Sequence, residues 1–441
     1  MKKYFYSLAV LMMGLSLTAC DSDDDDNKSD GNGQFSVVTT TPIVDQQNYT
    51  SNTSGYTDKS FGNKAIDNCM TLIGNLEKAN EAIASAQLTE EQENYLRKVL
   101  ETLVSNVIVP TYTSLADETE KLEKTLNNLT VNSITQQQIN AACEDFKLAR
   151  MYWEQSEAFL GGAAADFDID PTIDSWPLNR SLLLNYFNGG MNDEMLEDAT
   201  ILGFHALEFI LFRDGKPRKV AEFQANDTYK NFEKITGAQE LAYAQTICKL
   251  LKERCFQLQV AWEGQTSANA SRMSVVKAAG LDITTENGLS FGENLTKAGI
   301  SGSKSNFRSL KAAIAQVLSD DEGSCAAIAN EVGTAKIANP FSAGDVSYVE
   351  SPYSYNSITD FRDNIRSIRN IWLGSTDRTA NTYSFHTFFA SVSSQSTNTA
   401  LEQAYVDAIE AISQMPAPFV RYCCTLWNIA FEDDEDWEVD E

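Results

Sequence analysis

The sequence predicts an all-α protein made of two helical bundles. Apolar residues recur at spacings of three and four along several long segments, which is the period of an amphipathic helix. Alternating patterns typical of strands are scarce. The chain has 441 residues, of which 43% are hydrophobic and 10% aromatic, so it can bury a substantial core. Two bundles of about 200 residues each, formed by long helices that pack side by side, fit these observations.

The first half contains four segments with helical periodicity. Along the first of them, Cys69, Ile73 and Leu76 recur at helical spacing. The second is expected to be broken or bent near Pro110, because proline cannot donate a backbone hydrogen bond. The segments expected to be helical are one from about Phe61, Thr89 to about Asn127, Thr135 to about Leu160, and Asp193 to about Phe212.

The second half has the same character, with helical segments separated by polar loops. Residues 265–303 are polar and rich in glycine, which favours a loop region with short helices. Residues 339–356 contain Pro340 and Pro352 and are expected to form a loop. The predicted helices are Ala238–Gly264, Asn306–Val332, Ser357–Leu373 and Ala400–Ile412.

The N-terminus is typical of a secreted lipoprotein. Lys2 and Lys3 precede an apolar stretch that is too short to span a membrane comfortably. The next residues, Leu17-Thr18-Ala19-Cys20, resemble a bacterial lipobox. This resemblance implies that residues 1–19 are a signal peptide and that Cys20 is lipidated, which anchors the protein to a membrane.

Acidic segments flank the predicted bundles. Residues 21–28 are mostly aspartate, and residues 20–60 are expected to form an acidic and polar tether. The aspartate run also resembles the export signal of some Bacteroidetes lipoproteins, which implies an outer-membrane protein exposed at the cell surface, with the periplasmic face as the alternative. Residues 432–441 are expected to form a solvated acidic tail. The bundles would then occupy residues 61–235 and 236–431.

Charge and residue counts exclude several functions. The chain has 34 Lys and Arg against 62 Asp and Glu, a formal net charge of −28, so it is a poor candidate for binding nucleic acid. Its two histidines, His205 and His386, cannot form a three-histidine zinc site or a histidine pair on one helical turn. The seven cysteines after Cys20 form no Cys-x-x-Cys pair, and we interpret them as small core residues.

The segment Ile201–Phe212 carries the most informative pattern. Nearly all of its residues are apolar, as expected of a buried helix, yet it contains His205 and Glu208. These residues are three apart and therefore lie on one face of the helix. A buried ionisable pair is costly unless its members are bonded to each other or hold a metal. The pattern by itself leaves open a metal site and a paired His–Glu that only stabilises the fold.

Gly203-Phe204-His205-Ala206-Leu207-Glu208 resembles the Gly-x-His-x-x-Glu signature of the imelysin family of bacterial envelope proteins. Other segments, in the order and spacing of that family, extend the resemblance to about residues 60–420. They are Val109–Tyr112, Ala149–Phe159, Ser175–Leu178, Asp363–Ile365, Trp372–Gly374 and Pro418-Phe419. The resemblance implies two helical halves with the His-x-x-Glu helix near their contact. It also implies a role in acquiring iron or another metal, or the metallopeptidase activity for which the family is classified.

The residues favour metal binding over hydrolysis. A hydrolytic zinc site needs three protein ligands, an open position for water and a general base. Beyond His205 and Glu208, the candidate ligands are Glu154 and Glu157, with Asp174 as a further candidate. Such an oxygen-rich set suits iron at least as well as zinc. The alternatives are a metallopeptidase that uses the same motif and a non-catalytic surface adaptor.

The remaining candidates concern a ligand pocket near the motif. Arg150 could hold an anionic ligand, although a buried bridge to a glutamate is favoured. Tyr152 and Trp176 could line the pocket, although packing is the usual role of such aromatics. The pocket would accept a metal or an iron complex, and envelope uptake proteins would be the partners. His386 lies in an aromatic stretch and is interpreted as a core or surface residue.

Overall fold

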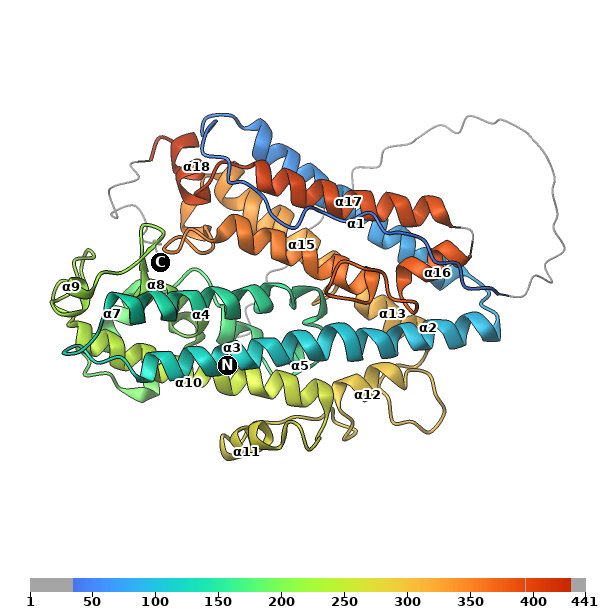
Figure 1. Ribbon diagram of the computed structural model, residues 1–441, viewed down its shortest axis with the longest axis horizontal. Helices are drawn as coiled ribbons and strands as arrows, with labels where there is room; N and C mark the ends of the chain where they lie inside the picture. Colours follow the sequence, from blue (N-terminus) through green and yellow to red (C-terminus); the bar gives the residue numbers. More distant parts are fainter. Residues whose placement is uncertain (1–34, 393, 430–441) are drawn as a thin grey trace. The chain divides into compact units, whose positions relative to one another are not determined.

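The computed structural model describes residues 35–392 and 394–429, drawn in colour in Figure 1. The predicted signal peptide, the predicted lipidation site Cys20, the aspartate run and the acidic tail lie outside the described residues. The described residues form one compact unit. No helix among the described residues is long and apolar enough to cross a membrane.

The described residues confirm an all-α fold. The helices up to residue 235 are α1 (Ser60–Ser85), α2 (Glu90–Leu103), α3 (Val109–Asn127), α4 (Gln136–Glu154), α5 (Ala163–Asp166), α6 (Asp170–Asp174), α7 (Arg180–Asn188), α8 (Gly203–Leu211) and α9 (Val220–Phe223). Those that follow are α10 (Gly237–Glu263), α11 (Ala270–Ala278), α12 (Phe291–Thr296), α13 (Leu310–Leu318), α14 (Cys325–Glu331), α15 (Ser357–Leu373), α16 (Phe385–Ser391), α17 (Gln395–Gln414) and α18 (Phe419–Leu426).

One small hairpin accompanies the helices. Strands β1 (Phe212–Arg213) and β2 (Lys216–Pro217) are antiparallel, with Phe212 opposite Pro217 and Arg213 opposite Lys216. The turn between them, Asp214-Gly215, has positive φ angles at both residues. A two-residue turn of this kind reverses the chain tightly. The Asp-Gly turn therefore reverses the chain directly after α8 and β1.

The long helices begin at residues that bond their first free amides. The side chains of Thr89, Thr135 and Thr236 each accept a hydrogen bond from the backbone N–H of the third residue of α2, α4 and α10, respectively. In each case that third residue is a glutamine, whose side chain bonds the threonine backbone in return. This reciprocal arrangement stabilises a helix start.

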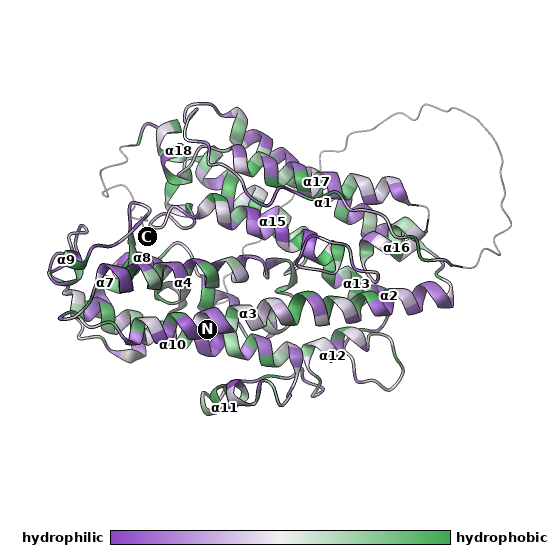
Figure 2. Cartoon of the chain, viewed as in Figure 1, coloured by the Kyte–Doolittle hydropathy of each residue, from purple (hydrophilic) through white to green (hydrophobic). Residues whose placement is uncertain are grey.

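The helices pack through the apolar faces that the periodicity predicts. Figure 2 shows hydrophobic and hydrophilic residues side by side along the long helices, as expected for helices with one buried face. The most extensive contacts join α1 to α17, and α3 to both α4 and α10 (Figure 1). Two of these pairs, α1 with α17 and α3 with α10, cross the predicted boundary between residues 235 and 236. The helices on the two sides of that boundary therefore share one core.

Two of the predicted helices have different bounds. The helix expected from Asp193 begins only at Gly203, because Gly203 has φ +71° and residues 193–201 form short 3-10 turns instead. The helix expected over Asn306–Val332 is interrupted between α13 and α14. There Ser324 caps a new helix start by accepting a hydrogen bond from the amide of Ala327.

Further features are local. The helix expected over Thr89–Asn127 is interrupted just before Pro110, where the π-helical turn Val104–Ile108 separates α2 from α3 and Pro110 lies in the first turn of α3. Such a turn accommodates the missing proline N–H. A second π-helical segment, Val332–Ala343, extends into the region expected to be a loop. Periodicity did not indicate the short helices α7, α16 and α18.

Residues 35–59 contain no helix, but they do not form the free tether that their polar composition predicts. They run beside α17 in Figure 1. The carboxylate of Asp45 is buried against the guanidinium groups of Arg366, at 3.1 Å, and Arg369, at 2.5 Å, both from α15. The backbone amide of Ile43 donates to Glu402 of α17 at 2.9 Å. Ion pairs and hydrogen bonds therefore attach this segment to the helices.

Asp45→Asn should weaken this attachment. The variant leaves Arg366 and Arg369 without their shared counter-ion, so we expect the free energy of unfolding to fall by about 3 kcal/mol. Protease cleavage within residues 35–59 should also become faster. Urea denaturation and limited proteolysis measure the two effects. Asp67→Asn, at an exposed position of α1, is the matched control and should change neither. Equal results for the two variants would contradict the proposed attachment.

Candidate metal centre

The His-x-x-Glu helix, α8, is buried along its whole length, as its composition predicts. Its first residue, Gly203, lies directly against the backbone of α6. A Cβ atom at Gly203 would lie 2.0 Å from the carbonyl oxygen of Ile173, so this position has no room for a side chain. The close approach brings Asp174, the neighbour of Ile173, beside His205.

His205 lies between two carboxylates. Its Nε2 atom is 3.0 Å from Oδ1 of Asp174, and its Nδ1 atom is 3.5 Å from Oε2 of Glu208. Burial and the nearby Arg150 lower the pKa of His205, but the two carboxylates outweigh them and raise it to about 9. Nε2 forms no well-oriented hydrogen bond to any described residue. The imidazole is therefore flanked by two carboxylates, and its Nε2 atom contacts Asp174 without a well-oriented hydrogen bond.

Glu208 holds a loop. Its Oε1 atom accepts hydrogen bonds from the backbone N–H of Tyr353, at 3.1 Å, and from the N–H and hydroxyl of Ser354, both at 2.7 Å. Its Oε2 atom faces His205 and forms no hydrogen bond to a described residue. Glu208 thus joins α8 to the segment before α15 and leaves one oxygen beside the imidazole.

Two groups of side chains have ligand atoms close enough to share one metal ion. One contains Asp174, His205 and Glu350, and the other contains Glu154, Glu157 and Asp174. Within each group the ligand atoms lie within 4.8 Å of one another, and all of these residues are buried. Glu208 belongs to neither group. The fold therefore gathers three of the predicted residues around Asp174 and adds Glu350, which no sequence pattern had indicated.

Arg150 occupies the middle of this cluster. Its guanidinium contacts Asp174 and Glu350, and it lies 2.5 Å from Oε1 of Glu154. This is the buried bridge to a glutamate that the sequence favours over an anion site. Trp153 donates its indole N–H to the second oxygen of Asp174 at 2.8 Å. Although burial raises the pKa of Asp174, Arg150 and His205 hold it well below its usual range.

Lys336 provides a second buried cation. Its Nζ atom lies 3.2 Å from Glu350 and 3.8 Å from Glu154, and it sits 5.2 Å from the centre of the Trp176 ring. Its neighbours raise its pKa although burial lowers it. Lys336 therefore stays charged and shares two carboxylates with Arg150.

The buried carboxyl groups outnumber the buried cations around them. They are Glu154, Glu157, Asp174, Glu208, Glu350 and Asp360, against Arg150, Lys336 and the imidazole of His205. Burial, the largest influence, raises the pKa of Glu154 and Glu157 well above the usual range and that of Asp360 to about 7. A buried excess of negative charge is unfavourable unless protons or a bound cation balance it. The cluster is therefore electrostatically suited to a cation.

A pocket of about 430 Å³ leads to His205. Trp176, Arg180 and Tyr353 are among the side chains that line it, and Asp174 and Glu350 are not. Trp176 is thus placed at a pocket, as predicted, whereas Tyr152 packs on the core. A small ligand can approach the imidazole by this route.

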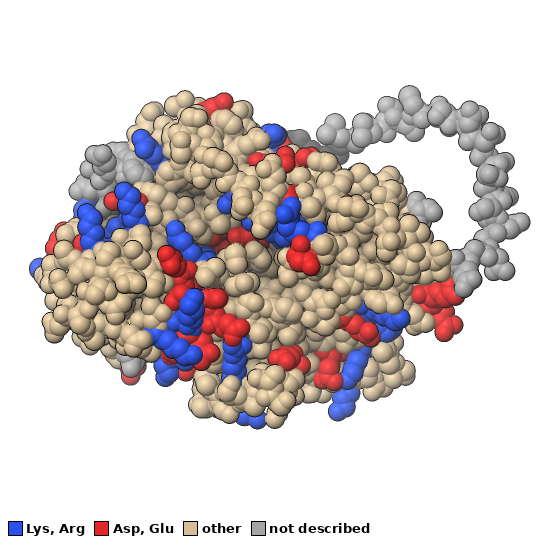
Figure 3. All heavy atoms as spheres, in the orientation of Figure 1, with Lys and Arg blue, Asp and Glu red and all other residues tan. Residues whose placement is uncertain are grey.

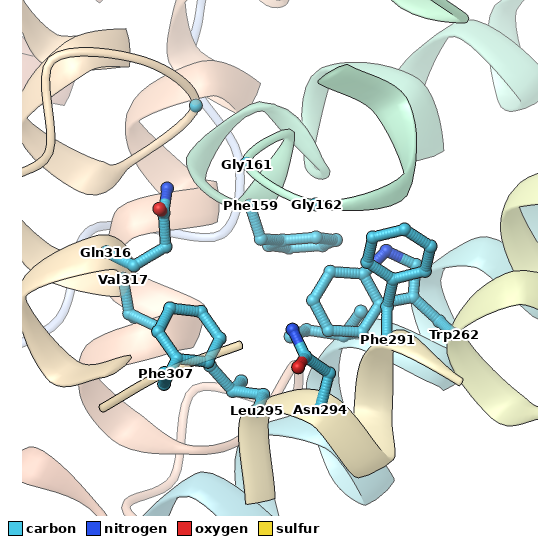
Figure 4. Close-up of a pocket in the computed structure, with 12 residues that line it drawn as sticks. Phe159, Gly161, Gly162, Trp262, Phe291, Asn294, Leu295, Phe307, Gln316 and Val317 are labelled. Atoms are coloured by element: carbon cyan, nitrogen blue, oxygen red, sulfur yellow. The ribbon is translucent and has the colours of Figure 1, made fainter. Parts of the chain in front are cut away.

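Other candidates from the sequence have structural positions. His386 is buried, pairs with Glu402 and lies 2.9 Å from the hydroxyl of Thr40, which agrees with its interpretation as a core residue. The seven described cysteines are buried and free, in agreement with a packing role. A pocket of about 360 Å³ (Figure 4) is lined by aromatic and amide side chains such as Phe159, Trp262 and Asn294. None of its described lining residues is charged, so it is unsuited to a metal.

Comparison with known proteins identifies the family. The family model described as Imelysin matches residues 108–435. The chain belongs to the imelysin family. The iron-regulated protein A of Synechococcus elongatus is 25% identical over 277 residues, which cover 63% of this chain and 64% of that protein. The match therefore spans slightly less than two thirds of that relative.

A solved structure shows the same fold. It is that of a protein from Parabacteroides distasonis, named an iron-regulated protein A precursor. The match covers 77% of the present chain and 96% of that chain, with 24% identity and a TM-score of 0.57. The imelysin fold is thus shown by comparison as well as by the helices.

Gly203→Ala should lower the stability of this imelysin-family protein more than the same substitution at an unhindered loop glycine. Alanine at φ +71° costs about 1 to 2 kcal/mol, and the clash with Ile173 should add about 2 kcal/mol. Gly280→Ala is the matched control, because φ is +70° and no atom lies within 4 Å of the position that its Cβ atom would take. Thermal unfolding of both variants tests the close approach, and equal losses of stability would contradict it.

Proposed function

We propose that this imelysin-family protein binds a metal ion at His205, Asp174 and Glu350. The observation that carries the proposal is the buried group of His205, Asp174 and Glu350, whose ligand atoms lie within 4.8 Å of one another, with Nε2 of His205 free of a well-oriented hydrogen bond. One imidazole nitrogen and two carboxylate oxygens form a donor set that suits iron, and also zinc. Glu208 would orient the imidazole from its second nitrogen, as carboxylates beside metal-bound histidines do.

Arg150 determines how the metal would bind. It contacts both Asp174 and Glu350, so a metal at these carboxylates competes with the guanidinium for the same oxygens. Glu154, at 2.5 Å, and Asp360, at 4.0 Å, provide other partners for Arg150 when a metal takes its place. The proton of His205 must also leave before the imidazole can bind a metal. The ion therefore replaces positive charge already present in the cluster.

Two features support a role in iron acquisition. The donor set is rich in oxygen, and the similar proteins from Synechococcus elongatus and Parabacteroides distasonis are named iron-regulated protein A and its precursor. A metal bound in this way would be cargo or a sensed ligand taken up near the cell surface. The predicted lipidation of Cys20 would keep the protein at the outer membrane, where envelope uptake proteins could receive the metal.

Binding is favoured over peptide hydrolysis. A metallopeptidase must bring a peptide bond to an open position on the metal, beside a general base. The pocket reaches His205, but neither Asp174 nor Glu350 lines it. Arg150 and Lys336 also neutralise the carboxylates that would serve as the base. A surface adaptor that binds no metal is the other alternative.

Metal loading tests the proposal. The full chain with Cys20→Ser should take up about one iron or zinc per molecule, and adding His205→Ala or Glu350→Gln should weaken binding about tenfold or more. Elemental analysis after dialysis measures the ratio, and competition with a chelator measures the affinity. His386→Ala is the matched control, because it removes the other buried histidine that pairs with a carboxylate. Its affinity should be unchanged.

Two outcomes would contradict metal binding at this centre. One is a chain that takes up no stoichiometric iron or zinc and whose His205→Ala variant is only less stable, as a structural adaptor predicts. The other is peptide cleavage by the metal-loaded protein that Glu208→Gln abolishes while the fold stays intact. The second outcome would support the metallopeptidase.

Lipidation of Cys20 is tested separately. A bacterium that expresses the full chain should attach labelled fatty acid to it and retain it in the membrane fraction. Cys20→Ser should lose both the label and the membrane association, because the lipid anchor requires the thiol. Ser22→Ala, two residues away, is the control and should keep both. An unlabelled wild-type protein would contradict the anchor.

A further inference from the structure

A second acidic feature lies beside the buried cluster. It is a solvent-open pocket of about 1120 Å³, which we call the acidic pocket. Six carboxyl side chains line it, and no lysine or arginine is among its described lining residues. The acidic residues are Glu157, Asp168, Asp170, Asp321, Glu322 and Glu331. The pocket therefore concentrates negative charge where solvent ions can enter.

Two separate parts of the chain form the walls of the acidic pocket. One wall comes from the segment between α4 and α6, and the other from the loop before α14, from α14 itself and from the start of the π-helical segment after it. The backbone N–H of Gly161 donates to the carbonyl of Gly323 at 3.0 Å and joins the two walls. A Cβ atom at Gly323 would lie 2.0 Å from the nitrogen of Gly161, so the walls are in direct backbone contact.

Glu157 distinguishes this pocket from an ordinary acidic surface. Its side chain lines the pocket, yet the residue is only 4% exposed. It forms no hydrogen bond or ion pair with any described residue, whereas the neighbouring Glu154 is bonded to Arg150 and Asn364. A buried carboxyl group without a partner is unfavourable in the absence of a ligand. Glu157 is therefore aimed into the pocket without a protein partner.

Lys336, the cation next to the pocket, does not form an ion pair with Glu157. Lys336 lies 3.5 Å from Glu331, but its shortest contact is with Glu350 in the buried cluster, and it does not line the pocket. Lys336 therefore offsets part of the negative charge next to the pocket, but the described lining residues themselves include six carboxyl groups and no cation. Asn330 and Thr334, which also line it, add side chains with oxygen atoms.

We propose that the acidic pocket binds a hydrated hard divalent cation of the Mg²⁺ or Mn²⁺ type, with Glu157 as the inner carboxylate ligand. Asp170 and Glu331 hold the cation through its water ligands, because they do not group with Glu157 among the side chains close enough to share a bare ion. Mg²⁺ keeps several waters when it binds to one or two carboxylates. The absence of nitrogen or sulfur ligands among the described lining residues disfavours softer metals.

This site is separate from the metal centre proposed above. It uses oxygen ligands only, faces a different pocket and does not require His205. An experiment can therefore show that one of the two sites does not bind metal independently of the result for the other. Asp168, from the turn after α5, and Asp170, the first residue of α6, are among the carboxyl groups that line the acidic pocket.

Titration with Mn²⁺ tests the site. The full chain with Cys20→Ser and His205→Ala, freed of metal with a chelator, should bind one Mn²⁺ saturably, as measured from free Mn²⁺ by electron paramagnetic resonance. Mg²⁺ should compete for it. Adding Glu157→Gln should weaken binding about tenfold or more, because an amide replaces the inner carboxylate. Glu81→Gln, at an exposed position of α1, is the matched control and should leave the affinity unchanged.

Two results would overturn the proposal. One is the absence of saturable Mn²⁺ binding at millimolar concentrations, and the other is equal affinity with and without Glu157→Gln. If circular dichroism shows that the Glu157 variant is unfolded, Glu331→Gln replaces it, since this side chain is partly exposed. That variant should bind Mn²⁺ about threefold more weakly, and an unchanged affinity would reject the site.

Discussion

The buried guanidinium of Arg150 is the interaction on which the arrangement of the site depends. It joins α4, which carries it, to Asp174 of α6 and to Glu350 in the segment before α15. Asp360 of α15 lies 4.0 Å from its Nε atom. A buried charge is tolerated only where its partners are in place, so these elements can pack closely only in the arrangement that pairs Arg150. The same constraint places many carboxyl groups in the interior, because Arg150 and Lys336 need them as partners. Burial raises the pKa of a carboxyl group whose negative charge these cations do not fully balance, such as Glu157.

The aspartate and glutamate side chains lie in different environments, among them the surface, the buried cluster and the acidic pocket. On the face shown in Figure 3, acidic and basic side chains are interspersed over the described surface. Further carboxyl groups collect at the buried cluster, where they outnumber Arg150 and Lys336, and in the acidic pocket, and Glu157 belongs to both groups. Net charge alone therefore does not indicate where a cation would bind. The decisive property is whether a carboxylate has a partner within the protein.

The sequence predicted the features that depend on local order. Helical periodicity located α1, α10, α15 and α17, and the three-residue spacing placed His205 and Glu208 on one buried face. Periodicity failed for residues 193–202. The left-handed conformation of Gly203 separates the short 3-10 turns before it from α8, and a periodic pattern of apolar residues does not reveal such a change of backbone conformation. It failed for residues 35–59 as well, because their polar composition does not show that Asp45 pairs with arginines more than 300 residues away.

The sequence by itself determined the fold class, the family resemblance and the helix that carries the motif, since each depends on residues close together in the chain. Only the tertiary structure decided which side chains surround His205. Asp174 is brought there by the contact of Gly203 with the backbone of Ile173, and Glu350 by its contacts with Arg150 and Lys336. Both contacts join residues far apart in the sequence. Their energies depend on burial, which no local pattern of residues expresses.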